Sequence, residues 1–231
     1  MKIKPLHPWK VTIAEAKTIQ LELAEKVVLE KLKAPVRVIA GADVSYARKG
    51  AICFAAVTVF NYPEMQVIEQ VTSSDAVSFP YVPGYLTFRE APALLQAFEK
   101  LSHEPDLVLF DGQGIAHPRR MGLATHSGMI LDKPAIGCAK SLLVGKFENP
   151  LSSKGDWSDL IYGGLLIGAA VRTRDRVKPV FVSPGFKITL HEAIEWVVKT
   201  CIGYRIPEPI RKSHFAVNQL RVEYEKENSR K

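Results

Sequence analysis

The sequence predicts an α/β fold, with a mixed β-sheet flanked by helices, in which an antiparallel meander is followed by parallel strands. Three β-rich runs follow one another with only tight turns between them, which is typical of a meander. Strand and helix patterns then alternate, an order that favours parallel strands covered by helices. The three runs of the meander are residues 36–47, 51–60 and 65–73.

The first predicted element is a helix that precedes the meander. Thr12 and Glu15 have the spacing of a capping box, and the helix-forming run after them extends to near Pro35. The turn RKG at 48–50 then joins the first two strands. Both strands are apolar on both faces, so we expect them in the centre of the sheet.

The second half of the chain supplies the remaining strands and helices. A helix is expected from Thr87 to about Ser102, with Pro92 in its first turns. No linker, repeat or low-complexity segment interrupts the pattern, so we expect a single domain, 1–231, with a frayed charged tail from about residue 226. The other elements are strands at 106–110, 135–140, 163–171 and 178–183, and helices at 121–132, 189–201 and 209–225.

The composition is that of a globular protein with a basic surface. The chain has 231 residues, of which 47% are hydrophobic, and 31 basic against 24 acidic residues give a formal charge of +7. Such a surface suits polyanions such as nucleic acid or anionic lipid. The three cysteines form no CxxC pair, so we expect buried free thiols. We find neither a signal-peptide pattern nor a membrane-spanning stretch, and expect a cytoplasmic monomer.

Two acidic residues occur where strands are predicted. Asp43 lies within the first strand and Asp111 directly follows the strand at 106–110. A buried carboxylate is costly unless it is paired or binds a cation. In the predicted order of strands these two strands are neighbours, so the two carboxylates could face each other across the sheet. A divalent metal would relieve their repulsion, with Glu90 as a third ligand. Alternatively, Asp43 pairs with an arginine and Asp111 caps a turn.

The segment FPYVPGYLTFRE, residues 79–90, predicts a rigid loop, because it holds two prolines and a glycine. It presents Tyr81 and Tyr85 to solvent or to a partner. A stiff loop with an aromatic tip is suited to wedging between stacked bases. A packed connection between two elements fits the same pattern.

The stretch DGQGIAHPRRMG follows Asp111 with glycines and adjacent arginines. Arg119 and Arg120 are candidates to bind phosphate, and Gly112 and Gly114 ease close backbone approach to a ligand. The alternative is a solvated basic loop.

Two histidines and one lysine are further candidates. His117 and His214 are each either catalytic or structural, and Lys140 ends a strand, where it is placed to balance an anion. His191 and Glu192 lack the second histidine of the HExxH zinc motif, so we discard them.

Together these motifs resemble the endonuclease V (deoxyinosine 3′ endonuclease) family over nearly the whole chain. The order of strands and helices is also that of the ribonuclease H-like architecture. Val82 stands where the family usually has isoleucine in its wedge motif. The matching segments are GADVSY, PYVPGYLTFRE, DGQGIAHPRRMGLATHSG, GCAKSLLVG and, least specifically, RKSHFA.

The resemblance implies an RNase H-like nuclease that depends on Mg²⁺, with Mn²⁺ as a substitute. The family cleaves the second phosphodiester bond on the 3′ side of a deaminated adenine and leaves 3′-hydroxyl and 5′-phosphate ends. It further implies metal binding by Asp43, Asp111 and Glu90. The implied catalytic residues are Asp43, Glu90, Asp111, Lys140 and His214.

The resemblance also implies a DNA-binding set, in which Tyr81 opens the duplex and the flipped hypoxanthine enters a pocket lined by backbone groups. The set comprises Tyr81, Val82, Pro83, Gly84, Leu86, Gly112, His117, Arg119, Arg120 and Gly122. The expected partner is inosine-containing DNA. Two alternatives remain: a ribonuclease acting on inosine-containing RNA, and a module that binds inosine-containing nucleic acid without cutting it.

Overall fold

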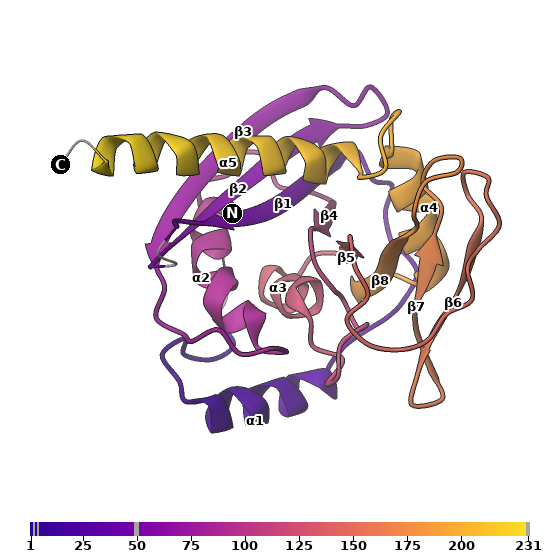
Figure 1. The fold of residues 1–231 in the computed structure, drawn as a ribbon, viewed down its shortest axis with the longest axis horizontal. Coiled ribbons are helices and arrows are strands. Elements are labelled where there is room, and N and C mark those ends of the chain that lie inside the picture. Colours follow the sequence, from indigo (N-terminus) through magenta and orange to yellow (C-terminus); the bar gives the residue numbers. More distant parts are fainter. Residues whose placement is uncertain (2, 4, 49–50, 230–231) are drawn as a thin grey trace.

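The computed structural model describes residues 1–231 except 2, 4, 49–50 and 230–231 (Figure 1). Within these residues the chain forms an eight-stranded sheet in the order β3-β2-β1-β4-β5-β8-β7-β6. The strands are β1 (Val38–Tyr46), β2 (Ile52–Asn61), β3 (Val67–Ala76), β4 (Leu107–Phe110), β5 (Ala135–Ala139), β6 (Trp157–Tyr162), β7 (Leu165–Val171) and β8 (Val180–Phe186). The helices are α1 (Ile13–Ala24), α2 (Leu86–Glu99), α3 (Leu123–Leu131), α4 (Leu190–Thr200) and α5 (Glu208–Asn228).

The strand pairing confirms the predicted mixed sheet. β1, β2 and β3 form the antiparallel meander, and β1, β4 and β5 pair in parallel. β8, β7 and β6 then extend the sheet with antiparallel pairing. Two residues of the predicted turn at 48–50 lie outside the described residues.

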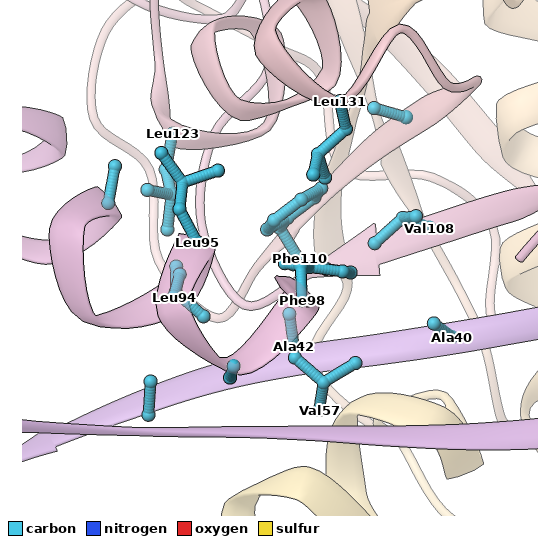
Figure 2. Close-up of a cluster of buried hydrophobic side chains, with 14 of the residues drawn as sticks. Ala40, Ala42, Val57, Leu94, Leu95, Phe98, Val108, Phe110, Leu123 and Leu131 are labelled. Atoms are coloured by element: carbon cyan, nitrogen blue, oxygen red, sulfur yellow. The ribbon is translucent and has the colours of Figure 1, made fainter. Parts of the chain in front are cut away.

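Helices cover both faces of the sheet. Successive side chains along a strand point to opposite faces, so an apolar strand packs against helices on both sides. Ala40, Ala42 and Phe110 belong to a hydrophobic cluster with residues of α2 and α3, which Figure 2 shows in close-up. Ile39 and Leu109 belong instead to a cluster on the other face with α4 and the start of α5. Each central strand therefore contributes to two cores, as its apolar composition predicts. α1 packs outside this arrangement, against the start of α2 (Figure 1).

The prediction that the first helix extends to near Pro35 is wrong, although its capping box at Thr12 and Glu15 is present. α1 ends at Ala24, and the chain then runs along α4. There the backbone N–H of Leu32 donates to the Glu192 carboxylate (3.0 Å), and the carbonyl of Val28 accepts from Lys187 N–H (2.8 Å). These tertiary hydrogen bonds outweigh a local helix preference of a few tenths of a kcal/mol per residue, on the order of magnitude of helix propensities.

Three smaller outcomes complete the fold. α5 continues to Asn228, beyond the point at which a frayed tail was predicted. β6 was not predicted, because its sequence WSDLIY is polar at intervals and lies mostly exposed at the edge of the sheet. The three cysteines are buried free thiols, as predicted.

Among the described residues, no helix has both the length and the apolarity that crossing a membrane requires.

Candidate active site

A cavity of about 530 Å³ opens beside the ends of the parallel strands. Its walls come from β1, from the segment that leads into α2, from α2 itself, and from the loops after β4 and β5. Ligand sites of α/β proteins commonly lie outside the carboxyl ends of parallel strands. Nearly all of the site residues predicted from the sequence line this cavity.

Asp43, Asp111 and His214 form an acid cluster: the two aspartates line the cavity, whereas His214 does not line it and contacts Asp43 from α5. One ligand atom from each residue lies within 4.8 Å of those of the other two. Asp111 is brought next to Asp43 because β1 and β4 are parallel neighbours, and its N–H donates to the carbonyl of Ala42 (3.1 Å). Asp43 bonds to His214, between Oδ2 and Nδ1 (2.7 Å), rather than to an arginine. The neighbouring placement of the two strand acids is therefore as predicted.

The charge of the acid cluster is not balanced. Burial, and then the nearby Asp111 charge, raise the pKa of Asp43 to about 6, against the opposing hydrogen bond from His214. Lys140 forms an ion pair with Asp111 from the end of β5. Two carboxylates and an imidazole within this distance are a donor set that suits a divalent cation, which would relieve the repulsion between the acids. The residues present therefore fit a divalent metal ion.

Glu90 lies in the same cavity but outside the acid cluster. It is buried on α2, where the Tyr46 hydroxyl donates to its Oε1 (3.1 Å). Burial is the main cause that raises the pKa of Glu90 to about 8, and the Asp43 and Asp111 charges add to it. Asp43 faces α5, whereas Glu90 approaches from α2 on the opposite face of the sheet. His214 rather than Glu90 therefore lies within ligand distance of the two aspartates, which differs from the predicted metal set.

α5 brings His214 to Asp43 by packing closely on β1. A Cβ on Gly41 would lie 2.1 Å from the carbonyl carbon of Pro209, so only glycine permits this approach. One turn further along, the buried Ser213 hydroxyl donates to the Gly41 carbonyl (2.7 Å). The glycine in GADVSY and the serine in RKSHFA thus fix the helix that carries His214.

Residues 80–86, the aromatic loop, form another wall of the cavity. The Tyr81 side chain is 72% exposed at the tip of this loop, and Leu86 at its end is 41% exposed. Val82 and Pro83 also line the cavity. Tyr85 was expected to face solvent, but it is buried beneath the Arg119 guanidinium, whose carbon lies 4.2 Å from the ring centroid. The loop therefore has one exposed aromatic tip and one buried aromatic base.

The glycine-rich stretch after β4 packs against the base of this loop. His117 Nε2 and Arg119 Nη2 both contact the carbonyl of Gly84, at 3.0 and 2.6 Å. Burial and the neighbouring Arg119 charge lower the pKa of His117 to about 4. Arg120 is exposed, with a positive φ of 55°. Of the two adjacent arginines, Arg119 therefore points inward and Arg120 outward.

The glycines of this stretch have different roles. Gly112 and Gly122 line the cavity, as the predicted ligand contacts require. Gly114 does not line it: a Cβ there would lie 2.3 Å from the carbonyl oxygen of Pro184, so its small size serves packing against β8. Sequence reasoning assigned no role to Tyr46, although GADVSY contains it, or to Gln20, which lies on a helix far from every recognised motif.

The comparisons with known proteins agree over nearly the whole chain. A sequence model of the endonuclease V family matches residues 21–215. The Endonuclease V of Trichormus variabilis is 49% identical over 212 residues, 91% of this chain and 96% of that protein. That of Dehalococcoides mccartyi strain BAV1 is 48% identical over 220 residues, 95% and 99% of the two chains.

Solved structures show the same similarity. The Bacillus subtilis Endonuclease V structure has a TM-score of 0.93 at 34% identity and covers 98% of this chain and 100% of its own. A Ciona intestinalis Endonuclease V, in complex with DNA containing an inosine followed by a ribo-adenosine, has a TM-score of 0.81 at 29% identity, over 93% and 100% of the chains. With both acids of the cluster, Glu90 and the aromatic loop in one cavity, this chain belongs to the endonuclease V family of nucleases.

Proposed function

We propose that this protein is a metal-dependent DNA repair endonuclease that recognises deoxyinosine and hydrolyses the second phosphodiester bond on its 3′ side, leaving 3′-hydroxyl and 5′-phosphate ends. The observation that carries the proposal is one cavity that is lined both by the two aspartates of the acid cluster and by the aromatic loop. Cutting and lesion recognition need adjacent groups of these two kinds. The inosine-containing DNA bound by the Ciona intestinalis relative supports the choice of lesion.

Asp43 and Asp111 would hold the divalent ion, which we propose to be Mg²⁺ with Mn²⁺ as a substitute. When bound, the ion supplies positive charge at the reacting phosphate. His214 fixes the orientation of the Asp43 carboxylate through their hydrogen bond. Glu90 completes the acidic centre from the α2 side, where it can hold a proton because its pKa is raised to about 8.

Lys140 and Arg120 are the cations that we place at the phosphates. Lys140 already contacts Asp111, so its ammonium lies beside the group that would bind the metal. A fixed cation there offsets the charge that develops on the phosphate in the transition state. The exposed Arg120 side chain is placed to contact the strand, and phosphate contacts would make binding sensitive to salt, in keeping with the net charge of +7.

The aromatic loop would separate the lesion from its partner strand. Tyr81 is exposed at the tip and would stack in the gap left by the displaced base. The flipped base would lie in the cavity against backbone groups near Gly84, Leu86, Gly112 and Gly122. A mispaired base costs less free energy to unstack than a paired one, which contributes to selectivity. We further propose that the chain acts as one domain and as a monomer.

The first test is cleavage of matched labelled oligonucleotides, one DNA and one RNA, each with a single inosine, alongside versions that carry adenosine instead. Each is incubated with Mg²⁺ and with a chelator. The expected result is a metal-dependent nick one nucleotide past the DNA inosine and no cut in the adenosine control. Cutting confined to RNA would change the substrate class, and tight binding without product would identify a non-cleaving reader instead.

A further inference from the structure

The carbonyl oxygen of Gly84, at the base of the aromatic loop, is contacted by three hydrogen-bond donors. They are Nε2 of Gln20 (3.0 Å), Nε2 of His117 (3.0 Å) and Nη2 of Arg119 (2.6 Å). A carbonyl oxygen has two lone pairs, so three donors saturate it. All three side chains come from outside the loop. We call Gln20, His117 and Arg119 the Gly84 clamp.

Gln20 links the other parts of the clamp. It lies on α1, is fully buried, and does not line the cavity. Its Oε1 accepts a hydrogen bond from Nε of Arg119 (2.6 Å), and its Nε2 also contacts the carbonyl of Met121 (3.4 Å). One amide therefore ties α1 to the aromatic loop and to the stretch after β4. A buried amide is costly unless it is hydrogen-bonded, and here both of its ends have partners.

The other two members are held so that each donates a hydrogen bond to the Gly84 carbonyl. His117 Nδ1 faces the backbone N–H groups of Arg119 (3.2 Å) and Met121 (3.4 Å) and accepts from them. The ring proton is therefore on Nε2, which donates to the carbonyl. The Arg119 guanidinium rests on the Tyr85 ring, which fixes its plane.

Gly84 itself is shaped for this clamp. Its φ of +81° is in the region that favours glycine, and a Cβ there would lie 2.9 Å from Nη2 of Arg119. The clamp thus closes around a backbone that carries no side chain. At the other end of the loop, Tyr81 is 72% exposed. The loop has a base held from three directions and a tip that projects into solvent.

We propose that Gln20 is a positioning residue that, through Gly84 and Arg119, holds the aromatic loop in place over the cavity and so contributes to the preference for inosine. This proposal rests on the proposed function. Gln20 touches neither the cavity nor the acid cluster, so its effect is expected in substrate binding rather than in the chemical step. If the base of the aromatic loop moves, part of the free energy of binding DNA is used to order the loop again.

The test replaces Gln20 by methionine, which has a similar volume and no hydrogen-bonding amide. The control is Leu23→Ala, which truncates a buried side chain on the same helix that cannot hydrogen-bond to Gly84 or Arg119. We expect Gln20→Met to speed amide hydrogen exchange across residues 80–86 and to raise KM for inosine-containing DNA by about tenfold, as for one lost hydrogen bond. kcat should stay within about threefold of wild type, because the acid cluster is untouched.

Leu23→Ala is expected to lower Tm while leaving loop exchange and KM unchanged. Wild-type exchange in residues 80–86 together with a wild-type KM in Gln20→Met would overturn the proposal, as would an equal effect in Leu23→Ala. If Gln20→Met does not fold, Gly84→Ala disturbs the clamp from the loop side, and unchanged exchange there would overturn it too. Hydrogen exchange needs no substrate, so a wild-type protein that fails to cut inosine-containing DNA refutes the proposed function without deciding the clamp.

Discussion

Two walls of the cavity are rich in polar groups: the acid wall, which carries the acidic side chains, and the loop wall, which is the aromatic loop with the Gly84 clamp at its base. They differ in whether these polar groups find partners within the protein. In the acid wall, the pKa of Asp43 is raised to about 6 and that of Glu90 to about 8, chiefly because burial disfavours their charged forms. In the loop wall, His117 is neutral and the Gly84 carbonyl is saturated by the clamp. The acid wall would be completed by a cation, whereas the hydrogen bonds that hold the aromatic loop are made within the chain.

This difference separates two tasks. A wall that is short of positive charge suits a bound cation, whose charge would change the pKa values of the acids around it. A wall whose hydrogen bonds are all made is preorganised and discriminates by shape. Changes in the acid wall should therefore alter the rate of cutting. Changes in the loop wall should alter the preference for inosine-containing over normal duplex.

The largest effect is expected from removing an acid of the cluster. Asp43→Ala or Asp111→Ala should lower cleavage by roughly 10³-fold or more, in the range found when a group that stabilises transition-state charge is lost. The fold should remain intact, because removing one carboxylate relieves repulsion with the other. Single-turnover cleavage and thermal unfolding measure the two properties. Asp159→Ala, an exposed acid on β6, is the matched control, and full activity in either cluster variant, with the metal retained, would refute the assignment.

A smaller effect of a different kind is expected at the tip of the loop wall. Tyr81→Ala should reduce the preference for inosine-containing over normal duplex by roughly 10- to 100-fold, since base–aromatic stacking contributes about 1–3 kcal/mol. Competition between labelled duplexes measures this ratio. Tyr162→Ala removes an exposed tyrosine that does not line the cavity and should change nothing. Unchanged discrimination in Tyr81→Ala would mean that the two walls do not divide the tasks as described.

The smallest effect is on stability as a function of pH. Since the pKa of Glu90 is raised to about 8, the folded protein binds more protons than the unfolded chain above the ordinary glutamate value. Its stability should therefore fall as pH rises towards 8, by at most about 1.4 kcal/mol per pH unit from this group. Glu90→Gln removes this contribution, so in chelator the variant should gain stability over wild type as pH increases.

The loop wall has the opposite pH dependence. The pKa of His117 is lowered to about 4 and, outside the cavity on α3, that of His126 to about 3, so the stability that each contributes is lost as pH falls below the ordinary histidine value of 6.5. These histidines are present in both wild type and Glu90→Gln, so they cancel in the difference between the two. Urea unfolding between about pH 5 and about pH 8 gives that difference. A difference that does not change with pH would show that Glu90 is ionised in the folded protein.

Sequence patterns predicted the elements whose local signals agree with their tertiary surroundings. The meander and the capping box of α1 follow from apolar runs and cap spacing, and the β1–β4 neighbours follow from the order of strands and helices. The end of α1 and the edge strand β6 did not, because contacts from distant residues decide them. The Glu192 carboxylate and the Leu32 N–H come from distant parts of the chain, so no local sequence pattern contains both.

The site shows the same division. The acids and the rigid loop could be recognised in the sequence because each departs from a local pattern. The acids place a charge in or directly after an apolar strand, and the loop holds prolines within a short span. The exchange of Glu90 for His214 beside the aspartates depends on which face of the sheet each helix covers. Gln20 has no local signal, because a glutamine on a helix surface and a buried one look alike in sequence.

The close packing of α5 on β1 also determines the stage of synthesis at which the acid cluster can be completed. Asp43 and His214 are 171 residues apart in the chain, and the hydrogen bond from Ser213 to Gly41 holds the helix that carries His214 against the strand that carries Asp43. Domains emerge from the ribosome with their N-terminal part first. The acid cluster is therefore completed only after nearly all of the chain has been translated, so an unfinished chain carries the two aspartates without the histidine that contacts Asp43.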